Sequence, residues 1–479
     1  MAKLYVFGIG GTGARVIRSL TMLLASGVKI DADEIIPVII DPDRANGDTT
    51  RTVELLKSYV KIRTDLKFDG GKANRFFETK INLDINPSVF LPIEDTQDKR
   101  FDEYIGYNGL SKSNRALASM LFSKKNLNAD MQVGFKGNPN IGSVVLNQIQ
   151  SSQIFRNVIS SIQQNDRIFI ISSIFGGTGA SGFPLLIKNI RQADQHINNY
   201  AIARSASIGA ITVLPYFGLK DDPDSAIDSS SFISKTKAAL SYYERNLNEA
   251  NVLYYIADKV KKQFDNYDGG EKQENDAHIV EVISALAILD FMSIDGQYLQ
   301  NDANNNPINP AYKEFGIKED ADVDFSKLGD VTNAIIKKPL TQMVLFSKFL
   351  KEKFSSSYKG QPWAKDLNFD DNFSHSPFYN EIKEFGNGYL IWLKELALNE
   401  RKFEPFEITI PENELFSLVQ NIEPAWVACL DSNYDLFNNR LNKCAKSHIA
   451  HSDSDKNNNF VQLFYEATKI LVEEKLRMN

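Results

Sequence analysis

The sequence contains few of the residues that build disulfide frameworks or zinc sites. Among its 479 residues there are two cysteines, Cys429 and Cys444, and five scattered histidines. Two thiols that form no CxxC pair indicate a reducing compartment, so we expect a cytoplasmic location. The histidines form no zinc-ligand pattern, and no metal centre built from cysteine and histidine is predicted.

Long apolar runs are missing as well. No eighteen consecutive apolar residues occur, and the apolar helix expected at residues 16–24 is too short to cross a bilayer. The first residues enter a strand directly, without the basic region and cleavage site of a signal peptide. We therefore expect a soluble protein with no membrane insertion.

An excess of positive charge is also absent. The formal net charge is −7, from 54 basic and 61 acidic residues. This balance argues against a dedicated nucleic-acid-binding protein, and no direct nucleic-acid partner is predicted. The length exceeds the size at which one hydrophobic core usually stops growing, so we expect two or three domains.

The most informative feature that is present is the glycine-rich segment 174–182, with the sequence IFGGTGASG. It follows an apolar, strand-like run at 167–172 and leads into a helix-like stretch at 183–193. Four glycines and three small residues allow the backbone to curl and to point several N–H groups at an anion. The following helix adds the positive end of its dipole. The segment therefore predicts a phosphate-binding loop.

A second glycine turn lies at the start of the chain. A buried strand expected at 3–7 leads into GIGGTG at 8–13, and an apolar helix follows through Leu23. Alone, this pattern is common to many nucleotide and dinucleotide folds, and either loop could be an ordinary tight turn. The pair is much more specific. The GxxxxGK motif followed by serine or threonine is absent, which excludes an ordinary P-loop NTPase.

Together the two loops resemble those of the tubulin/FtsZ superfamily, which has a GxGGxG-type turn after the first strand and a GGGTGSG-type loop after a later one. Phe175 stands where the family usually has a glycine, and Ala180 is a further small variation. The resemblance covers roughly residues 1–330. It implies that phosphates are held, mainly by backbone N–H groups, at Gly10, Gly11, Thr12, Gly13, Gly176, Gly177, Thr178, Gly179, Ala180 and Ser181.

The remaining pattern predicts an α/β fold with a parallel sheet, because apolar strand-like runs alternate with helical patterns up to about residue 257. A long apolar helix is expected at 277–292, where the family has a helix through the middle of the molecule. The predicted organisation is a nucleotide-binding domain at 1–257, a central helix and catalytic-type loop at 258–330, and a mainly helical C-terminal domain at 331–479.

Ligands of such sheets bind at the carboxyl ends of the strands, so polar residues there are further candidates. The resemblance places Asp41, at the end of the second strand, near phosphates and Mg²⁺; a solvated Asp-Pro turn is the alternative. The loop 134–142 resembles the family's loop at the terminal phosphate, with Lys136, Gly137 and Asn138; a flexible surface loop is the alternative. Asn275, at the start of the central helix, either contacts the base or caps the helix.

A candidate for catalysis follows the central helix. The stretch Asp322-Val323-Asp324-Phe325 resembles the Asn-x-Asp-Phe of the family's catalytic loop. Such acids orient water for in-line attack on a terminal phosphate. In the family, this loop reaches the nucleotide of the next protomer, which makes hydrolysis depend on assembly. Asp324 is the first candidate and Asp322 the second; a helix-capping acidic turn is the alternative.

The resemblance thus implies a protein that binds GTP or GDP with Mg²⁺ and hydrolyses GTP on self-association, with itself as partner. A different class remains open, namely a Rossmann-type dinucleotide enzyme or an adenylating enzyme. Its ribose-binding acid would be Asp31 or Asp33 by spacing, or Asp41 at a strand end. That interpretation leaves the second glycine loop unexplained. A third alternative is a scaffold protein in which a bound nucleotide, never hydrolysed, only stabilises the fold.

Overall fold

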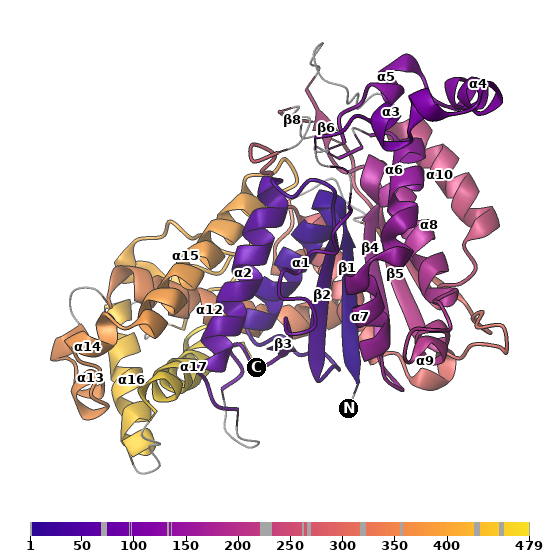
Figure 1. The fold of residues 1–479 in the computed structure, drawn as a ribbon. Coiled ribbons are helices and arrows are strands. Elements are labelled where there is room, and N and C mark those ends of the chain that lie inside the picture. Colours follow the sequence, from indigo (N-terminus) through magenta and orange to yellow (C-terminus); the bar gives the residue numbers. More distant parts are fainter. Residues whose placement is uncertain are drawn as a thin grey trace.

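The centre of the molecule is a seven-stranded parallel sheet (Figure 1). The computed structural model describes residues 2–478 except 69–73, 95, 97, 132–133, 136, 221–231, 261–262, 266–269, 317–321, 355–357, 426–431 and 450–454. The strand order is β3-β2-β1-β4-β5-β7-β9. The strands are β1 Lys3–Ile9, β2 Glu34–Ile40, β3 Lys80–Ile81, β4 Arg167–Ser173, β5 Ser207–Val213, β7 Val252–Ala257 and β9 Ala311–Gly316. The short strands β6 Gly218–Leu219 and β8 Gln263–Phe264 pair separately.

The topology determines where a ligand can bind. All pairs in the large sheet are parallel, and the strand order reverses between β1 and β4. In open α/β sheets, this reversal leaves a crevice outside the carboxyl ends of the two strands. Both glycine loops begin there, because one follows β1 and the other follows β4.

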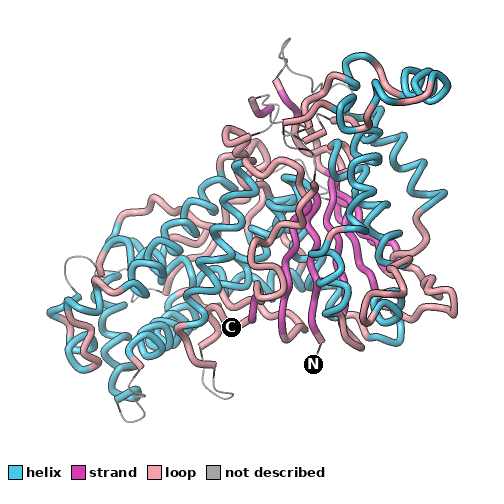
Figure 2. The backbone as a smooth tube through the Cα atoms, viewed as in Figure 1, coloured by secondary structure: helices cyan, strands magenta, loops and turns pink. Residues whose placement is uncertain are grey.

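Helices cover both faces of the sheet (Figure 2), so its strands are apolar on both sides. Alternate residues of β1 enter different cores: Leu4 and Val6 on one face, Tyr5 and Phe7 on the other. The helices of this half are α1 Gly10–Ala25, α2 Gly47–Thr64, α3 Phe101–Tyr104, α4 Lys112–Leu121, α5 Lys124–Leu127, α6 Pro139–Val145, α7 Gln153–Ser161, α8 Gly177–Arg191, α9 Tyr200–Ser205 and α10 Phe232–Asn246.

The expected central helix is α11, Ile279–Ser293, and it packs against α1 and the sheet. Its last turn is fixed to the start of β4, because Arg167 donates to the carbonyls of Phe291, Met292 and Ile294. The cap is not Asn275. His278 Nδ1 accepts from the backbone of Val280, and Glu281 completes a capping box.

The C-terminal region is helical (Figure 1), as predicted. Among the residues described after Gly316 there is no strand, only isolated bridges such as Phe406 to Val419. Its larger helices share the core that contains α1, α2 and α11, with Phe346 stacked on Phe76. The helices are α12 Asp330–Glu352, α13 Pro362–Asp366, α14 Asp371–Ser374, α15 Pro377–Ala397, α16 Asn433–Ile449 and α17 Lys456–Lys475.

The fold class predicted from the sequence is therefore confirmed: a parallel α/β sheet, a central helix and a mainly helical C-terminal region. The division into domains at residues 257 and 330 stays a prediction. No helix in the described part of the chain is long and apolar enough to cross a membrane.

Candidate functional site

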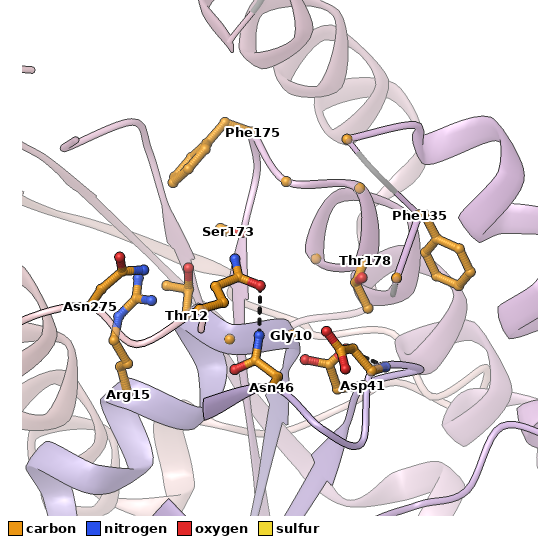
Figure 3. A pocket seen from close by; sticks show the side chains of 18 of the residues that line it. Gly10, Thr12, Arg15, Asp41, Asn46, Phe135, Ser173, Phe175, Thr178 and Asn275 are labelled. Atoms are coloured by element: carbon orange, nitrogen blue, oxygen red, sulfur yellow. Dashed lines mark hydrogen bonds between the residues drawn. The ribbon is translucent and has the colours of Figure 1, made fainter. Parts of the chain in front are cut away.

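One pocket lies at the carboxyl ends of β1, β2, β4 and β5, where the strand order reverses (Figure 3). Its lining includes ten of the residues singled out from the sequence. These ten are Gly10, Gly11, Thr12, Asp41, Gly137, Gly176, Gly177, Thr178, Gly179 and Asn275. The structure thus brings together five segments that are far apart in the sequence.

Two helices begin at this pocket without a side-chain cap. Helix α1 starts directly after β1, with Ile9 as its N-cap, and α8 has Gly176 as its N-cap. Neither residue has a polar side chain that could accept from the first N–H groups of the helix. Those N–H groups therefore remain available to a ligand. Two positive helix ends at one pocket favour negative charge there.

The glycines at the first loop are required by geometry. Gly10 has a φ of +70°, which side-chain-bearing residues rarely adopt. A Cβ added to Gly13 would lie 2.5 Å from the carbonyl carbon of Gly8, so α1 can pack this closely on β1 only with glycine there. The two loops face each other, since a Cβ on Gly10 would lie 3.6 Å from the Cβ of Thr178.

Three of the predicted phosphate-loop residues, Gly13, Ala180 and Ser181, do not line the pocket. Gly13 faces Gly8 of β1, as described above. Ser181 Oγ donates to the carbonyl of Gly177, and the carbonyl of Ala180 accepts from Tyr243. We infer that these residues shape the loops and that the exposed N–H groups belong to their neighbours.

The third loop lies against the second glycine loop. A Cβ on Gly177 would come within 3.0 Å of the backbone nitrogen of Asn138 and 3.1 Å of that of Gly137. Gly142 is similarly close, because its Cβ would lie 2.1 Å from Ser181 Oγ. The described part of this loop is thus packed into the site. Lys136, the predicted positive charge, lies outside the described residues.

Two carboxyl groups follow β2 in the pocket wall. Asp41 and Asp43 are 6% and 4% exposed. The pKa of Asp41 is raised to about 8, mainly by burial and also by the nearby Asp43 and Asp48, against the hydrogen bond from the backbone of Asp43. Burial also raises the pKa of Asp43. Carboxylate oxygens are ligands that Mg²⁺ prefers. No cluster of three or more metal-ligating side chains occurs among the described residues.

A buried ion-pair network forms the other side of the pocket. The Arg15 guanidinium donates to Glu281 at 2.6 Å, to Asp48 at 2.7 Å and to the hydroxyl of Tyr216 at 2.6 Å. Burial alone would lower the pKa of Arg15, but Tyr216 and the two carboxylates raise it well above its usual value. Arg15 is therefore a fixed cation that the sequence analysis did not identify.

The same network reaches the C-terminal region. Glu395 of α15 accepts from Arg18 of α1 at 2.6 Å and from Arg51 of α2 at 3.3 Å. It also accepts from the backbone of Ala277, just before α11. The Glu395 carboxylate thus contacts α1, α2 and the segment just before the central helix α11.

Aromatic and amide side chains complete this side. Phe175, Phe217 and Phe232 line the pocket, with Phe175 and Phe217 in an edge-to-face pair. Figure 3 shows Arg15 and Asn275 on one side of Gly10, and Asp41 and Thr178 on the other. The backbone of Asn275 donates to Asp48, which holds its side chain at the pocket.

The acids proposed for catalysis lie elsewhere. Asp324 caps a 3-10 turn through the backbone of Ser326 and accepts from Asn421 at 2.7 Å. Asp322 accepts from the backbone of Lys402. Neither lines the pocket of its own chain. Asp31 and Asp33, the acids expected by spacing for a dinucleotide enzyme, precede β2 and so lie at the opposite edge of the sheet. Of the three ribose-binding candidates, only Asp41 reaches the pocket.

Two solved structures resemble this chain at a distance. No family model matches the sequence, and no curated protein is significantly similar to it. CetZ from Methanosaeta thermophila is 15% identical over 61% of this chain and 54% of its own, with a TM-score of 0.31. CetZ2 from Haloferax volcanii, in a GTPgS-bound protofilament, is 12% identical over 62% and 61%, with a TM-score of 0.28. The chain thus spans less than two thirds of both structures. A likeness this distant carries no argument about activity, so the function has to be inferred from the geometry of the site.

Proposed function

We propose that this chain is a tubulin/FtsZ-like protein that binds GTP or GDP with Mg²⁺ and hydrolyses GTP on self-assembly. The observation that carries the proposal is the convergence of two uncapped helix N-termini, those of α1 and α8, on one pocket. Such an arrangement supports binding of a polyphosphate through backbone N–H groups.

A polyphosphate brings more negative charge than helix dipoles neutralise. No P-loop lysine is present in the sequence, and Arg15 is already paired with Asp48 and Glu281. Asp41 and Asp43 would therefore hold a Mg²⁺ ion, which needs phosphate oxygens and water for its remaining ligands. The ion would neutralise phosphate charge and restore the ionised form of both carboxyl groups.

The opposite side of the pocket suits a base. Phe175 and Phe217 offer aromatic faces for stacking. Arg15 offers donors, and Asn275 offers a donor and an acceptor, for ring nitrogens and a carbonyl. Donors facing a carbonyl favour guanine over adenine, which has an amine at that position. A base contact is one of the two roles that the sequence leaves open for Asn275, and Arg15 is added by its position.

Hydrolysis is the second part of the proposal. Asp324 and Asp322 lie outside their own pocket, as residues that act on a neighbouring protomer must. Asp324 caps a 3-10 turn at Ser326, and Asp322 accepts from the backbone of Lys402. These structural contacts favour the scaffold alternative, in which a bound nucleotide is never hydrolysed. Turnover measured against protein concentration distinguishes the two.

The test is binding and turnover of GTP, ATP and NAD, with light scattering recorded across protein concentration. We expect selective GTP binding that requires Mg²⁺, and hydrolysis per protomer that rises with concentration. Selective GTP binding without turnover or scattering would establish the scaffold function instead. Preference for ATP or NAD would contradict the proposal and favour a Rossmann-type or adenylating enzyme.

A further inference from the structure

Helix α4, Lys112–Leu121, presents an apolar surface that no described part of the chain covers. Leu117, Met120 and Leu121 are 55%, 85% and 59% exposed. Their spacing of three and four residues places them on one face of the helix. Figure 1 shows α4 at the outer end of a group with α3 and α5, away from the sheet.

The inner face of α4 is already occupied. Ala118 is buried, and Ser119 shares a hydrogen bond with the hydroxyl of Tyr107. Arg115 lies over the Tyr107 ring and donates to the carbonyl of Asn108. These contacts fix the rotation of α4 about its axis. The apolar face therefore points away from the rest of the molecule.

The charged residues of the segment that carries this face are all basic, whereas the neighbouring α3 adds Asp102 and Glu103, which both pair with Arg100. Residues 110–128 contain Lys112, Arg115, Lys124 and Lys125 and no aspartate or glutamate, although the whole chain carries a net charge of −7. The three lysines are exposed. An outward apolar stripe flanked by lysines is the composition of a helix that lies in the interface of an anionic bilayer.

A second copy of the chain fits less well. The large groove at the amino edge of the sheet is apolar in part, with Leu286 and Leu289 of α11 in its wall. Its four basic side chains, however, outnumber its three acidic ones, so the groove offers no net negative charge to a basic helix; the four are Lys29, Arg75, Lys338 and Lys469. A nucleic acid would pair with the lysines but would leave the leucines and the methionine in water.

We propose that α4 binds the surface of a membrane rich in anionic lipid. Leu117, Met120 and Leu121 enter the boundary between headgroups and acyl chains, and Lys112, Lys124 and Lys125 contact the phosphates. The exposed face of α4, and not the pocket, therefore faces the lipid.

The test is co-sedimentation of the full chain with vesicles of phosphatidylcholine, with and without phosphatidylglycerol. We expect binding only to the anionic vesicles, weaker at high salt. Replacing Lys112, Lys124 and Lys125 with Gln lowers the partition coefficient roughly a hundredfold, since each lysine near an anionic surface contributes about a factor of five. The double variant Leu117→Gln/Met120→Gln loses binding as well.

The matched control is Ile391→Gln on α15, which removes an apolar side chain that is also 55% exposed but lies on another surface. It should bind vesicles like the original chain, and far-UV circular dichroism checks the fold of every variant. The proposal is overturned if the original chain does not sediment with anionic vesicles, or if Leu117→Gln/Met120→Gln binds them equally well. It is also overturned if that double variant lowers the oligomeric mass without lipid, because α4 would then be a contact between copies.

Discussion

On one side of the pocket the groups that face a ligand belong to the backbone, whereas on the other side they are buried side chains that hold one another in place. The glycine loops expose N–H groups of α1 and α8, which no side chain caps. Arg15, Asp48, Glu281 and Tyr216 form a hydrogen-bonded network opposite them, and Arg15 also lines the pocket. The backbone side can take any polyphosphate, so selection between nucleotides has to come from the side-chain side.

The largest expected effect is on the side-chain side. Glu281→Ala leaves the Arg15 guanidinium with one carboxylate less in a buried setting and removes the capping box of α11. We expect it to lower the free energy of unfolding by about 3–5 kcal/mol, measured by urea denaturation. The control is Glu274→Ala, whose side chain is 58% exposed and pairs with Arg51 at 3.4 Å. That change should cost about 0–1 kcal/mol. Equal costs would mean that the network contributes no more than a surface pair.

The next effect depends on pH. The unfolded chain releases the Asp41 proton near pH 4, whereas the folded protein keeps it until about pH 8. The folded state binds more protons in this window, so the stability of the nucleotide-free protein falls as pH rises, by at most about 1.4 kcal/mol per pH unit.

Asp41→Asn removes this titration and keeps an acceptor for the backbone of Asp43. We expect a stability gain that grows from pH 5 to pH 8, together with weaker Mg²⁺-dependent GTP binding. Urea denaturation at both pH values measures the gain, with the exposed Asp366→Asn as control. A gain that does not change with pH would contradict the raised pKa of Asp41.

On the backbone side, two glycines provide a matched pair. Gly10 and Gly106 both have positive φ, +70° and +59°, but only Gly10 lies at the pocket. Alanine at either position should cost about 1–2 kcal/mol of stability. Gly10→Ala should in addition weaken GTP binding by about tenfold or more, because relief of the positive φ shifts the loop and misaligns a charge-assisted hydrogen bond worth about 1.5–3 kcal/mol. Calorimetric titration measures the affinities, and equal losses for both variants would exclude a direct role of the first loop.

The smallest expected change in stability concerns the acid outside the pocket. Asp324→Ala removes a cap and should cost about 1 kcal/mol. If Asp324 acts on a neighbouring protomer, the variant also slows GTP hydrolysis at high protein concentration without affecting binding. Asn421→Ala removes the other hydrogen bond that Asp324 accepts but keeps the carboxylate and its cap at Ser326, so its turnover should be normal. Slow turnover in both variants would assign Asp324 a structural role only.

The same two sides differ in how far the sequence predicts them. A glycine loop is local: strand, turn and helix follow one another within about twenty residues, so IFGGTGASG and GIGGTG predict both the fold and the phosphate side. The partners of Arg15 are 33, 201 and 266 residues away in the sequence, and no local pattern connects them. The signal that the sequence does contain is a pair of arginines, Arg15 and Arg18, on a mainly apolar helix directly after a glycine turn.

Two further differences have similar causes. Asn275 was weighed as a helix cap because asparagine is a common one, but the chain bends into α11 three residues later, where His278 and Glu281 form the capping box. Strand β9, Ala311–Gly316, lies beyond residue 257, after the last strand-like run of the predicted sheet. It lies at the edge of the sheet, and so it lacks the continuous apolar run that marks the inner strands.

Glu395 has a consequence for how the chain melts. Through Arg18, Arg51 and the backbone of Ala277, one residue of α15 holds the first two helices and the entry to the central helix together. The two halves also share a core, so neither retains its packing when the other unfolds. We therefore expect a single cooperative thermal transition. A nucleotide that binds only to the folded pocket would then protect the distant C-terminal helices from hydrogen exchange as strongly as the loops that touch it.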